Sequence, residues 1–324
     1  MKAIVCKAFG SPETLVYEEV PSRPIAANEV RIAVKAAGVN FPDTLIIEGK
    51  YQLKANPPFT PGAEVAGKVL EIGDKVKNVR PGDDVAAILP TGGYAEEAIA
   101  GSDAVIPLPR DMDHTVAAGF PLVYGTTLYA LKQRAQLKAG ETLLVLGAAG
   151  GVGLAAVQLG KIMGARVIAA ASNGDKLALC TQQGADAVVD YSKEPLKEAV
   201  KKLTKGQGAD VIYDPVGGDL PQECFSSINW NGRYLIIGFA SGKIPEVALN
   251  RLLLKGASAV GVFWGAFVAR EPKMNWENFQ QLFAWHAEGK LKPYLSKTYP
   301  LAHAGEALRD MLDRKVTGKI VLVP

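Results

Sequence analysis

The chain has few of the residues that build disulfides and metal sites. Its 324 residues include three cysteines, far apart, and three histidines, none of them paired. An odd number of scattered cysteines excludes a disulfide framework and indicates a reducing compartment. A tetrahedral zinc site needs three or four Cys, His or carboxylate ligands, and its structural form uses closely spaced cysteines. The sequence therefore predicts no metal site. The isolated cysteines and histidines are Cys6, Cys180, Cys224, His114, His286 and His303.

Charge of one sign and long apolar runs are also scarce. The net charge is +3 and no Lys/Arg block stands out, which argues against a nucleic-acid partner. No stretch of about 18 uncharged apolar residues is present, so no membrane-spanning helix is predicted. Residues 1–9 alternate like a strand and have no apolar core of the signal-peptide kind. We expect a cytoplasmic protein.

The length and the first third of the chain predict two domains, the first rich in β-strands. A chain of 324 residues exceeds the usual size of one domain, and 48% hydrophobic residues suffice for large cores. Short strand-like runs are separated by Gly/Pro turns such as Pro81-Gly82-Asp83, a pattern typical of a partly closed barrel. The predicted strands are residues 2–9, 14–20, 29–39, 64–72, 84–88 and 94–100.

The middle of the chain alternates strands with helices, which predicts right-handed crossovers and a parallel sheet. Six strands make a complete doubly wound dinucleotide fold. In the tail, two helices (276–288 and 302–314) precede a strand at 319–323 that we expect to rejoin the first domain. The six predicted strands are 142–146, 166–171, 187–190, 210–213, 234–237 and 258–262, and the helices between them are 154–163, 176–183, 196–203, 220–227 and 249–254.

A glycine-rich turn, residues 147–153, joins the first of these strands to its helix. It reads Ala148-x-Gly150-x-x-Gly153. In such a turn small residues allow the sharp bend, the approach of the backbone to a pyrophosphate, and close packing of helix on strand. The helix N-terminus then offers unpaired N–H groups to the anion. The spacing predicts a dinucleotide site, with Ala149, Gly150, Gly151 and Val152 as contacts.

The residues after the second strand favour NADP over NAD. An NAD site places a carboxylate there to bind the ribose 2′-hydroxyl, and this position is Ser172. A hydroxyl, an amide and a lysine would bind a 2′-phosphate, so Ser172, Asn173 and Lys176 are the predicted contacts. Alternatively, Ser172 caps the next helix and Lys176 is a surface residue. Asp175 is acidic and close, and we expect it to point away in the first turn of that helix.

Four short motifs stand out: residues 37–43 (AGVNFPD), 61–67 (PGAEVAG), 123–127 (VYGTT) and 214–218 (DPVGG). Together they resemble the medium-chain dehydrogenase/reductase superfamily, in its zinc-independent NADPH:quinone oxidoreductase branch. Asn40 stands where the zinc enzymes have a cysteine, and Ala63 where they have a histidine. The resemblance implies a GroES-like β-rich catalytic domain (1–122, completed by 265–324) and a Rossmann NADP-binding domain with a doubly wound parallel sheet (123–264).

The same resemblance implies further cofactor contacts. Tyr191 matches a tyrosine near the adenosine 2′-phosphate. Lys319 matches a G-K position near the cofactor, although a plain surface lysine is an equal alternative. The aromatic residues among the remaining contacts have packing as their alternative role. Those remaining contacts are Thr126 or Thr127 on the nicotinamide side, Phe239, Ala240 and Ser241 at the nicotinamide ribose, and Phe263 and Trp264 at the nicotinamide edge.

Two residues of the first domain are the catalytic candidates. Tyr51 follows Asn40-x-x-Asp43 at a spacing that resembles the enoyl-thioester reductases, in which this tyrosine donates a proton. A phenol is able to hydrogen-bond a carbonyl or protonate an enolate carbon. The alternative is an aromatic residue that lines a pocket. We expect the Asn40 amide to orient a carbonyl or the nicotinamide ribose.

The predicted function is NADPH-dependent hydride transfer to a quinone. One alternative is reduction of enoyl-CoA or another α,β-unsaturated carbonyl with Tyr51 as the proton donor, in which case Lys50 and Lys54 would meet the nucleotide phosphates of CoA. A second alternative is a non-catalytic NADPH-binding protein. The resemblance also implies a homodimer through the edge strand of the cofactor domain, residues 258–262.

Overall fold

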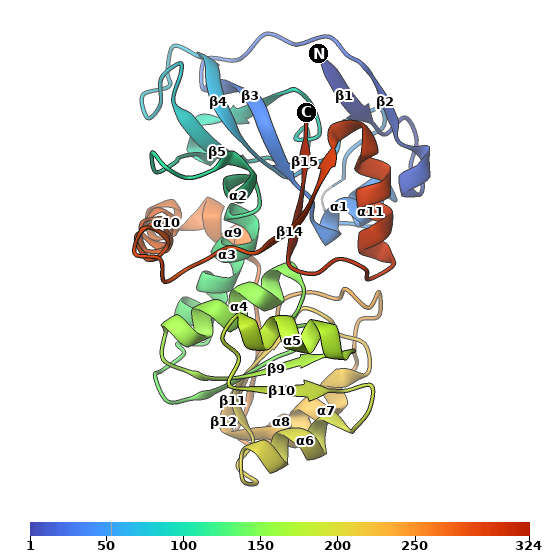
Figure 1. Cartoon of the computed structure of the whole chain (residues 1–324), viewed down its shortest axis with the longest axis vertical. Coiled ribbons are helices and arrows are strands. Elements are labelled where there is room, and N and C mark those ends of the chain that lie inside the picture. Colours follow the sequence, from blue (N-terminus) through green and yellow to red (C-terminus); the bar gives the residue numbers. More distant parts are fainter. Residues whose placement is uncertain (53) are drawn as a thin grey trace. The chain divides into compact units, whose positions relative to one another are not determined.

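The chain forms two compact units. The computed structural model describes residues 1–52 and 54–324. The first unit consists of Met1–Leu122 and Pro293–Pro324, and the second of Val123–Lys292. Both ends of the chain therefore belong to the first unit (Figure 1). No helix in the described part of the chain is both long enough and apolar enough to cross a membrane.

The first unit is built on a seven-stranded sheet and a separate pair, β1–β2. The strand order is β14-β15-β3-β4-β5-β7, and β6 also pairs with β3. The expected return of the chain end is confirmed, because β15 is hydrogen-bonded to β3. The strands are β1 (Lys2–Val5), β2 (Val16–Glu19), β3 (Glu29–Gly38), β4 (Glu64–Ile72), β5 (Asp84–Ile88), β6 (Glu97–Gly101), β7 (Val105–Pro107), β14 (Leu295–Pro300) and β15 (Lys319–Val323); the helices are η1 (Pro12–Thr14), α1 (Phe41–Ile47), η2 (Ser102–Ala104), α2 (His114–Ala118), η4 (Leu301–His303) and α11 (Ala304–Leu312).

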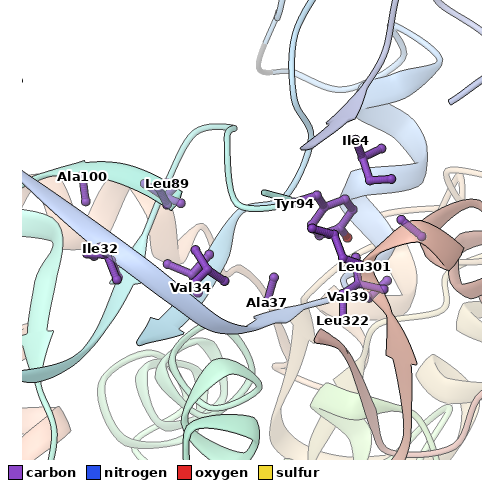
Figure 2. Close-up of a cluster of buried hydrophobic side chains, with 14 of the residues drawn as sticks. Ile4, Ile32, Val34, Ala37, Val39, Leu89, Tyr94, Ala100, Leu301 and Leu322 are labelled. Carbon is purple, nitrogen blue, oxygen red and sulfur yellow. The ribbon is translucent and has the colours of Figure 1, made fainter. Parts of the chain in front are cut away.

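The core of the first unit follows from the two-residue period of its strands. In β3 the alternate residues Val30, Ile32 and Val34 are buried. They join one cluster with side chains of β15 and η4 (Figure 2). Tyr94 belongs to the same cluster and is 0% exposed, so its hydroxyl must find a partner inside the protein.

The second unit is a doubly wound α/β fold, as predicted. Its six strands are all parallel, in the order β10-β9-β8-β11-β12-β13. Chain order 3-2-1-4-5-6 is that of dinucleotide folds, with the switch point between β8 and β11. The strands are β8 (Thr142–Val145), β9 (Arg166–Ala171), β10 (Ala187–Asp190), β11 (Ala209–Asp214), β12 (Ile228–Ile236) and β13 (Ser258–Gly261); the helices are α3 (Pro121–Leu128, which begins in the first unit), the π-helix η3 (Tyr129–Arg134), α4 (Gly151–Ile162), α5 (Gly174–Gln182), α6 (Leu196–Leu203), α7 (Leu220–Ser227), α8 (Asn250–Leu253), α9 (Trp264–Arg270) and α10 (Pro272–Ala287).

Helices cover both faces of this sheet, and the strand residues alternate between them. Leu144 and Ile168 join a cluster with residues of α6 and α7. Their neighbours Leu143 and Val167 meet α4 on the other face, where a Cβ atom added at Gly160 would lie 2.6 Å from Leu143 Cδ2. Because both faces of the sheet are buried, the central strand β8 is apolar on both sides, and Leu143, Leu144 and Val145 are all buried.

The boundary of the second unit differs from the expectation. We expected the first unit to resume at residue 265, whereas it resumes at Pro293. Helices α9 and α10 pack on the second unit's own π-helix: the Phe267 ring stacks on Tyr129 with centroids 4.1 Å apart, and Gln133 Nε2 donates to Asn278 Oδ1 at 2.9 Å. These contacts across more than a hundred residues of sequence leave no local pattern.

Candidate functional site

The glycine-rich turn lies where β8 ends and α4 begins, at the switch point of the sheet. Gly147 has a φ of +54°, which favours glycine, and a Cβ atom added at Gly153 would lie 2.3 Å from the Gly147 carbonyl oxygen. The amides of Gly151, Val152 and Gly153 form the first turn of α4, so no helical carbonyl precedes them as an acceptor. The turn therefore fits a phosphate cradle, with close backbone approach and free donors.

The end of β9 carries an amide and a hydroxyl in place of a carboxylate. Asn173 is the N-cap of α5, and its Oδ1 accepts from the Lys176 N–H at 3.0 Å. The alternative in which Ser172 caps this helix is not what the structure shows; Ser172 precedes the cap and is exposed. Asp175 lies in the first turn of α5 and is exposed, which agrees with its expected place there.

The third strand brings Tyr191 to the same edge of the sheet. Tyr191 follows β10, and its N–H donates to the carbonyl of Ala171, the last residue of β9, at 3.2 Å. The structure thus brings the predicted adenosine-side residues together at the carboxyl ends of β9 and β10.

The predicted ribose contacts lie in the loop that follows β12. The N–H of Ala240 donates to the Pro215 carbonyl at 3.0 Å, and that of Ser241 to the Val216 carbonyl at 2.9 Å. The loop is therefore fixed to the turn after β11, on the other side of the switch point from β9 and β10.

Thr126 and Thr127 differ in their surroundings. The hydroxyl of Thr127 is fully buried, donates to the Val123 carbonyl at 2.8 Å and lies 2.9 Å from the Tyr213 hydroxyl. It is therefore occupied inside the second unit. Thr126 is 9% exposed and is the better candidate for a contact with a ligand.

Phe263 and Trp264 likewise separate into an exposed and a buried residue. Phe263 is 65% exposed, whereas Trp264 is 6% exposed. A Cβ atom added at Gly125 would lie 2.5 Å from Trp264 Cζ2, and the indole N–H donates to Asn275 Oδ1 at 3.2 Å. Packing accounts for Trp264, which the sequence alone could not separate from a cofactor contact.

The first unit holds a buried polar cluster that connects three distant parts of the chain. The Lys319 ammonium lies 2.5 Å from Glu64 Oε1 and 2.9 Å from the Val39 carbonyl, and it also donates to Asn40 Oδ1. Asn40 Nδ2 donates to Glu64 Oε1 at 2.9 Å. The Asn40 amide is thus engaged on both sides. Lys319 is 7% exposed, so the alternative of a plain surface lysine is wrong.

Asp43 extends this cluster toward Tyr51. Its Oδ2 accepts from the Asn40 N–H at 2.8 Å and from the Tyr94 hydroxyl at 2.7 Å, while its buried Oδ1 has no partner among the described residues. Burial raises the pKa of Asp43 to about 6. Burial, together with the charge of Asp43, raises the pKa of Tyr51, so its phenol keeps its proton at neutral pH and remains a donor.

Sequence reasoning missed the partners in this cluster. Glu64 and Tyr94 carry no local signal of their role, although Glu64 stands in the P-G-x-E motif that was recognised. Gly62 has a φ of +98°, and a Cβ atom there would lie 2.4 Å from Tyr94 Cδ1, so this glycine is what admits the Tyr94 ring. Among the residues that the structure describes, no group of three or more His, Cys, Asp or Glu side chains has a metal-binding arrangement.

Each of the two units matches a known protein family. Residues 26–110 match the alcohol dehydrogenase GroES-like domain, and residues 151–287 match the zinc-binding dehydrogenase family. A GroES-like unit joined to a six-stranded dinucleotide fold defines the medium-chain dehydrogenases/reductases, which confirms the predicted fold class.

Similar proteins and solved structures indicate which family of these dehydrogenases/reductases the chain belongs to. A quinone oxidoreductase-like protein 2 homolog from Nematostella vectensis is 41% identical over 99% of this chain and 88% of its own length. The Escherichia coli quinone oxidoreductase, solved in complex with NADPH, superposes with a TM-score of 0.93 at 29% identity, with 100% of each chain covered. The CurK enoyl reductase superposes with a TM-score of 0.88 at 27% identity, covering 99% of this chain and 98% of that one. The chain belongs to the quinone oxidoreductase family.

Proposed function

We propose that this protein is an NADPH-dependent reductase that transfers a hydride to a quinone without a metal ion. The observation that carries the proposal is the edge of the second unit, where the glycine turn offers three helix-start amides and the end of β9 offers Ser172 and Asn173 in place of a carboxylate. The NADPH-bound quinone oxidoreductase with the same fold supports this choice of cofactor.

Different residues would bind different parts of the cofactor. The amides of Gly151 and Val152 would hold the pyrophosphate, with Ala149 and Gly150 beside them. Ser172, Asn173, Lys176 and Tyr191 would hold the adenosine 2′-phosphate, and Phe239, Ala240 and Ser241 the nicotinamide ribose. Bound there, the cofactor supplies a hydride, so the protein has only to position and polarise the acceptor.

The independence from metal rests on the chemistry of two side chains. Ala63 offers no ligand atom, and the Asn40 amide is already bonded to Glu64 and to Lys319. The Lys319 ammonium supplies the positive charge that the buried Glu64 carboxylate requires. A divalent cation would have to displace this ion pair.

The test is turnover by protein that has been dialysed against a chelator. Oxidation of NADPH is followed with 9,10-phenanthrenequinone and with a 1,2-naphthoquinone, next to a series of enones. The proposal predicts quinone turnover that added zinc does not increase. Tight binding of NADPH without turnover of any quinone or enone would favour the non-catalytic binding protein.

A second candidate, reduction of α,β-unsaturated carbonyls, is favoured by Tyr51. The phenol is partly buried and protonated and lies within the electrostatic reach of Asp43. Such a group is suited to protonate the carbon that becomes an enolate when the hydride adds. The enoyl reductase of the same fold supports this candidate.

The two lysines near Tyr51 do not favour a CoA thioester in particular. The Lys50 ammonium pairs with Glu48 at 2.8 Å, and Lys54 Nζ donates to the Gly49 carbonyl at 2.9 Å. Both would have to exchange these partners for the phosphates of CoA. A smaller enone fits the observed contacts better.

The protein is further proposed to be a homodimer that pairs through β13. This strand is the last in its sheet, and three of its four residues are exposed. A few residues before the strand, Leu253 is 79% exposed and Leu254 72% exposed, so exposed apolar side chains precede it in the chain. Sedimentation velocity at micromolar concentration should give a dimer, and a monomer there would contradict the proposal.

A further inference from the structure

The buried carboxylate of Asp214 forms hydrogen bonds to the turn after β11 and to β12, on one side of the switch point. Asp214 ends β11 and is 2% exposed. Its Oδ1 accepts from the N–H groups of Val216 at 2.7 Å and Gly217 at 2.9 Å, and its Oδ2 accepts from the hydroxyl of Tyr234 on β12. Its carbonyl accepts from the N–H of Ile237 at 3.0 Å. Asp214 thus joins β11, the turn 215–218 and β12.

The turn 215–218 in turn supports two loops that face the predicted cofactor. A Cβ atom added at Gly147 would lie 2.8 Å from Val216 Cγ2, so Val216 packs on the glycine-rich turn. The loop 238–243 is bonded to the other side through Ala240 and Ser241, as described above, and through the N–H of Gly218, which donates to the Lys243 carbonyl at 3.0 Å. The turn is therefore the layer between the pyrophosphate turn and the ribose loop.

The hydrogen-bond partners of the Asp214 carboxylate indicate that it holds the turn 215–218 in position. No lysine, arginine or histidine forms an ion pair with Asp214 in the part of the chain that the structure describes; its partners are two backbone amides and a phenol. Burial raises the pKa of Asp214 and also that of Tyr234, so the phenol stays a donor. Three hydrogen bonds to one buried carboxyl hold the turn 215–218 and Tyr234 in fixed positions, which suits a group that positions a turn.

We infer that Asp214, assisted by Tyr234, is a positioning residue that sets the affinity for the nicotinamide half of the cofactor separately from the adenosine half. The strand order carries this separation. The residues after β9 and β10 lie on one side of β8, and the turn and loop after β11 and β12 lie on the other. The inference rests on the proposed function, in which loop residues 239–241 meet the nicotinamide ribose.

The test compares two ligands on the full chain by titration calorimetry: NADPH, and 2′,5′-ADP, which contains only the adenosine half. Asp214→Ala should weaken binding of NADPH by about tenfold or more, as expected for the loss of three buried hydrogen bonds, and should change the affinity for 2′,5′-ADP by less than about twofold. Asp214→Asn should restore most of the NADPH affinity, because its amide oxygen still accepts from Val216 and Gly217.

A matched control lies on the same strand. Asp210 is at the other end of β11, where its carboxylate accepts from the Thr142 N–H at 2.8 Å and from Asn229 Nδ2 at 2.7 Å. Asp210→Ala should lower stability and leave both affinities unchanged. If Asp214→Ala does not fold, Tyr234→Phe removes a single hydroxyl and should weaken NADPH alone by about threefold.

The outcomes separate the two claims. Equal weakening of both ligands in Asp214→Ala, or no weakening of either, would overturn the positioning role. Failure of the unchanged protein to bind 2′,5′-ADP would also overturn it, because the two halves would not be recognised separately. Failure of the unchanged protein to bind NADPH would contradict the proposed function itself.

Discussion

The ammonium of Lys319 lies 2.5 Å from the carboxylate of Glu64, with both side chains buried and 254 residues of sequence between them. A buried carboxylate that loses its cation is left uncompensated, which destabilises a protein by about 3–5 kcal/mol. Lys319→Met should therefore reduce the free energy of unfolding by about that amount, as measured by urea denaturation. Glu64→Gln together with Lys319→Met should regain a large part. If Lys319→Met were as stable as the unchanged protein, the ion pair between Lys319 and Glu64 would not contribute to stability.

Asp43 should give the stability of the protein a pH dependence of unusual sign. Burial raises the pKa of Asp43 to about 6 from an unfolded value of 3.8, while Tyr94, Lys319 and the Asn40 N–H act to lower it and Glu64 to raise it. The folded state then binds more protons than the unfolded state between about pH 4 and 6, so this group's contribution to stability falls as the pH rises through that window, by up to about 3 kcal/mol, and is constant above it.

The variant Asp43→Asn isolates this effect. Its amide oxygen still accepts from Asn40 and Tyr94, and it cannot ionise, so its stability relative to the unchanged protein should increase from pH 4 to 6. Glu29→Gln is the control of opposite sign, because Arg23 lowers the pKa of Glu29 to about 2. A parallel pH course for Asp43→Asn and the unchanged protein would contradict the assignment.

Tyr51→Phe should separate the two candidate acceptors. Loss of a general acid typically reduces turnover about hundredfold or more, so kcat with enones should fall by that factor. A quinone accepts its protons from water, and its turnover should change by less than about threefold. Tyr17→Phe removes a hydroxyl from a residue that is 41% exposed, and it controls for the substitution itself. Unchanged turnover of enones would exclude proton donation by Tyr51.

Gly153 should tolerate no side chain. A Cβ atom there would lie 2.3 Å from the Gly147 carbonyl oxygen, so Gly153→Ala must displace either the turn or α4. Overpacking of this kind destabilises by about 1–3 kcal/mol, and the affinity for NADPH should fall with it. Gly174→Ala is the matched control, since nothing lies within 4 Å of a Cβ atom in the first turn of α5. Full NADPH affinity in Gly153→Ala would argue against the cradle.

The second unit was predictable because its signals are local. The helices 196–203 and 220–227 match the observed α6 and α7 at both ends, since each has a buried apolar face and a polar exposed one. The glycine-rich turn is encoded in seven consecutive residues. By contrast, no helix is predicted over residues 41–47, where the structure has α1; Pro42 lies in its first turn, a position in which proline is well accommodated.

The cluster around Asn40 could be predicted only in part. Its motifs were recognised, but the bonds from Lys319 to Asn40 and Glu64 connect residues whose separation exceeds any sequence period. Lysine is rarely buried in proteins, so the residue type alone favours a surface position for Lys319, whereas the structure buries it. The same holds for Asp214 and Tyr234, which meet because β11 and β12 are neighbours in the sheet.

The central claim, an NADPH-dependent and metal-independent quinone reductase, is tested most directly by one ratio. It is kcat/KM for NADPH divided by kcat/KM for NADH, measured with 9,10-phenanthrenequinone on chelator-treated protein. Ser172 and Asn173 in place of a carboxylate predict a ratio of about ten or more, and Ser172→Asp should lower it toward one. A ratio below one in the unchanged protein, or turnover that requires added zinc, would contradict the account.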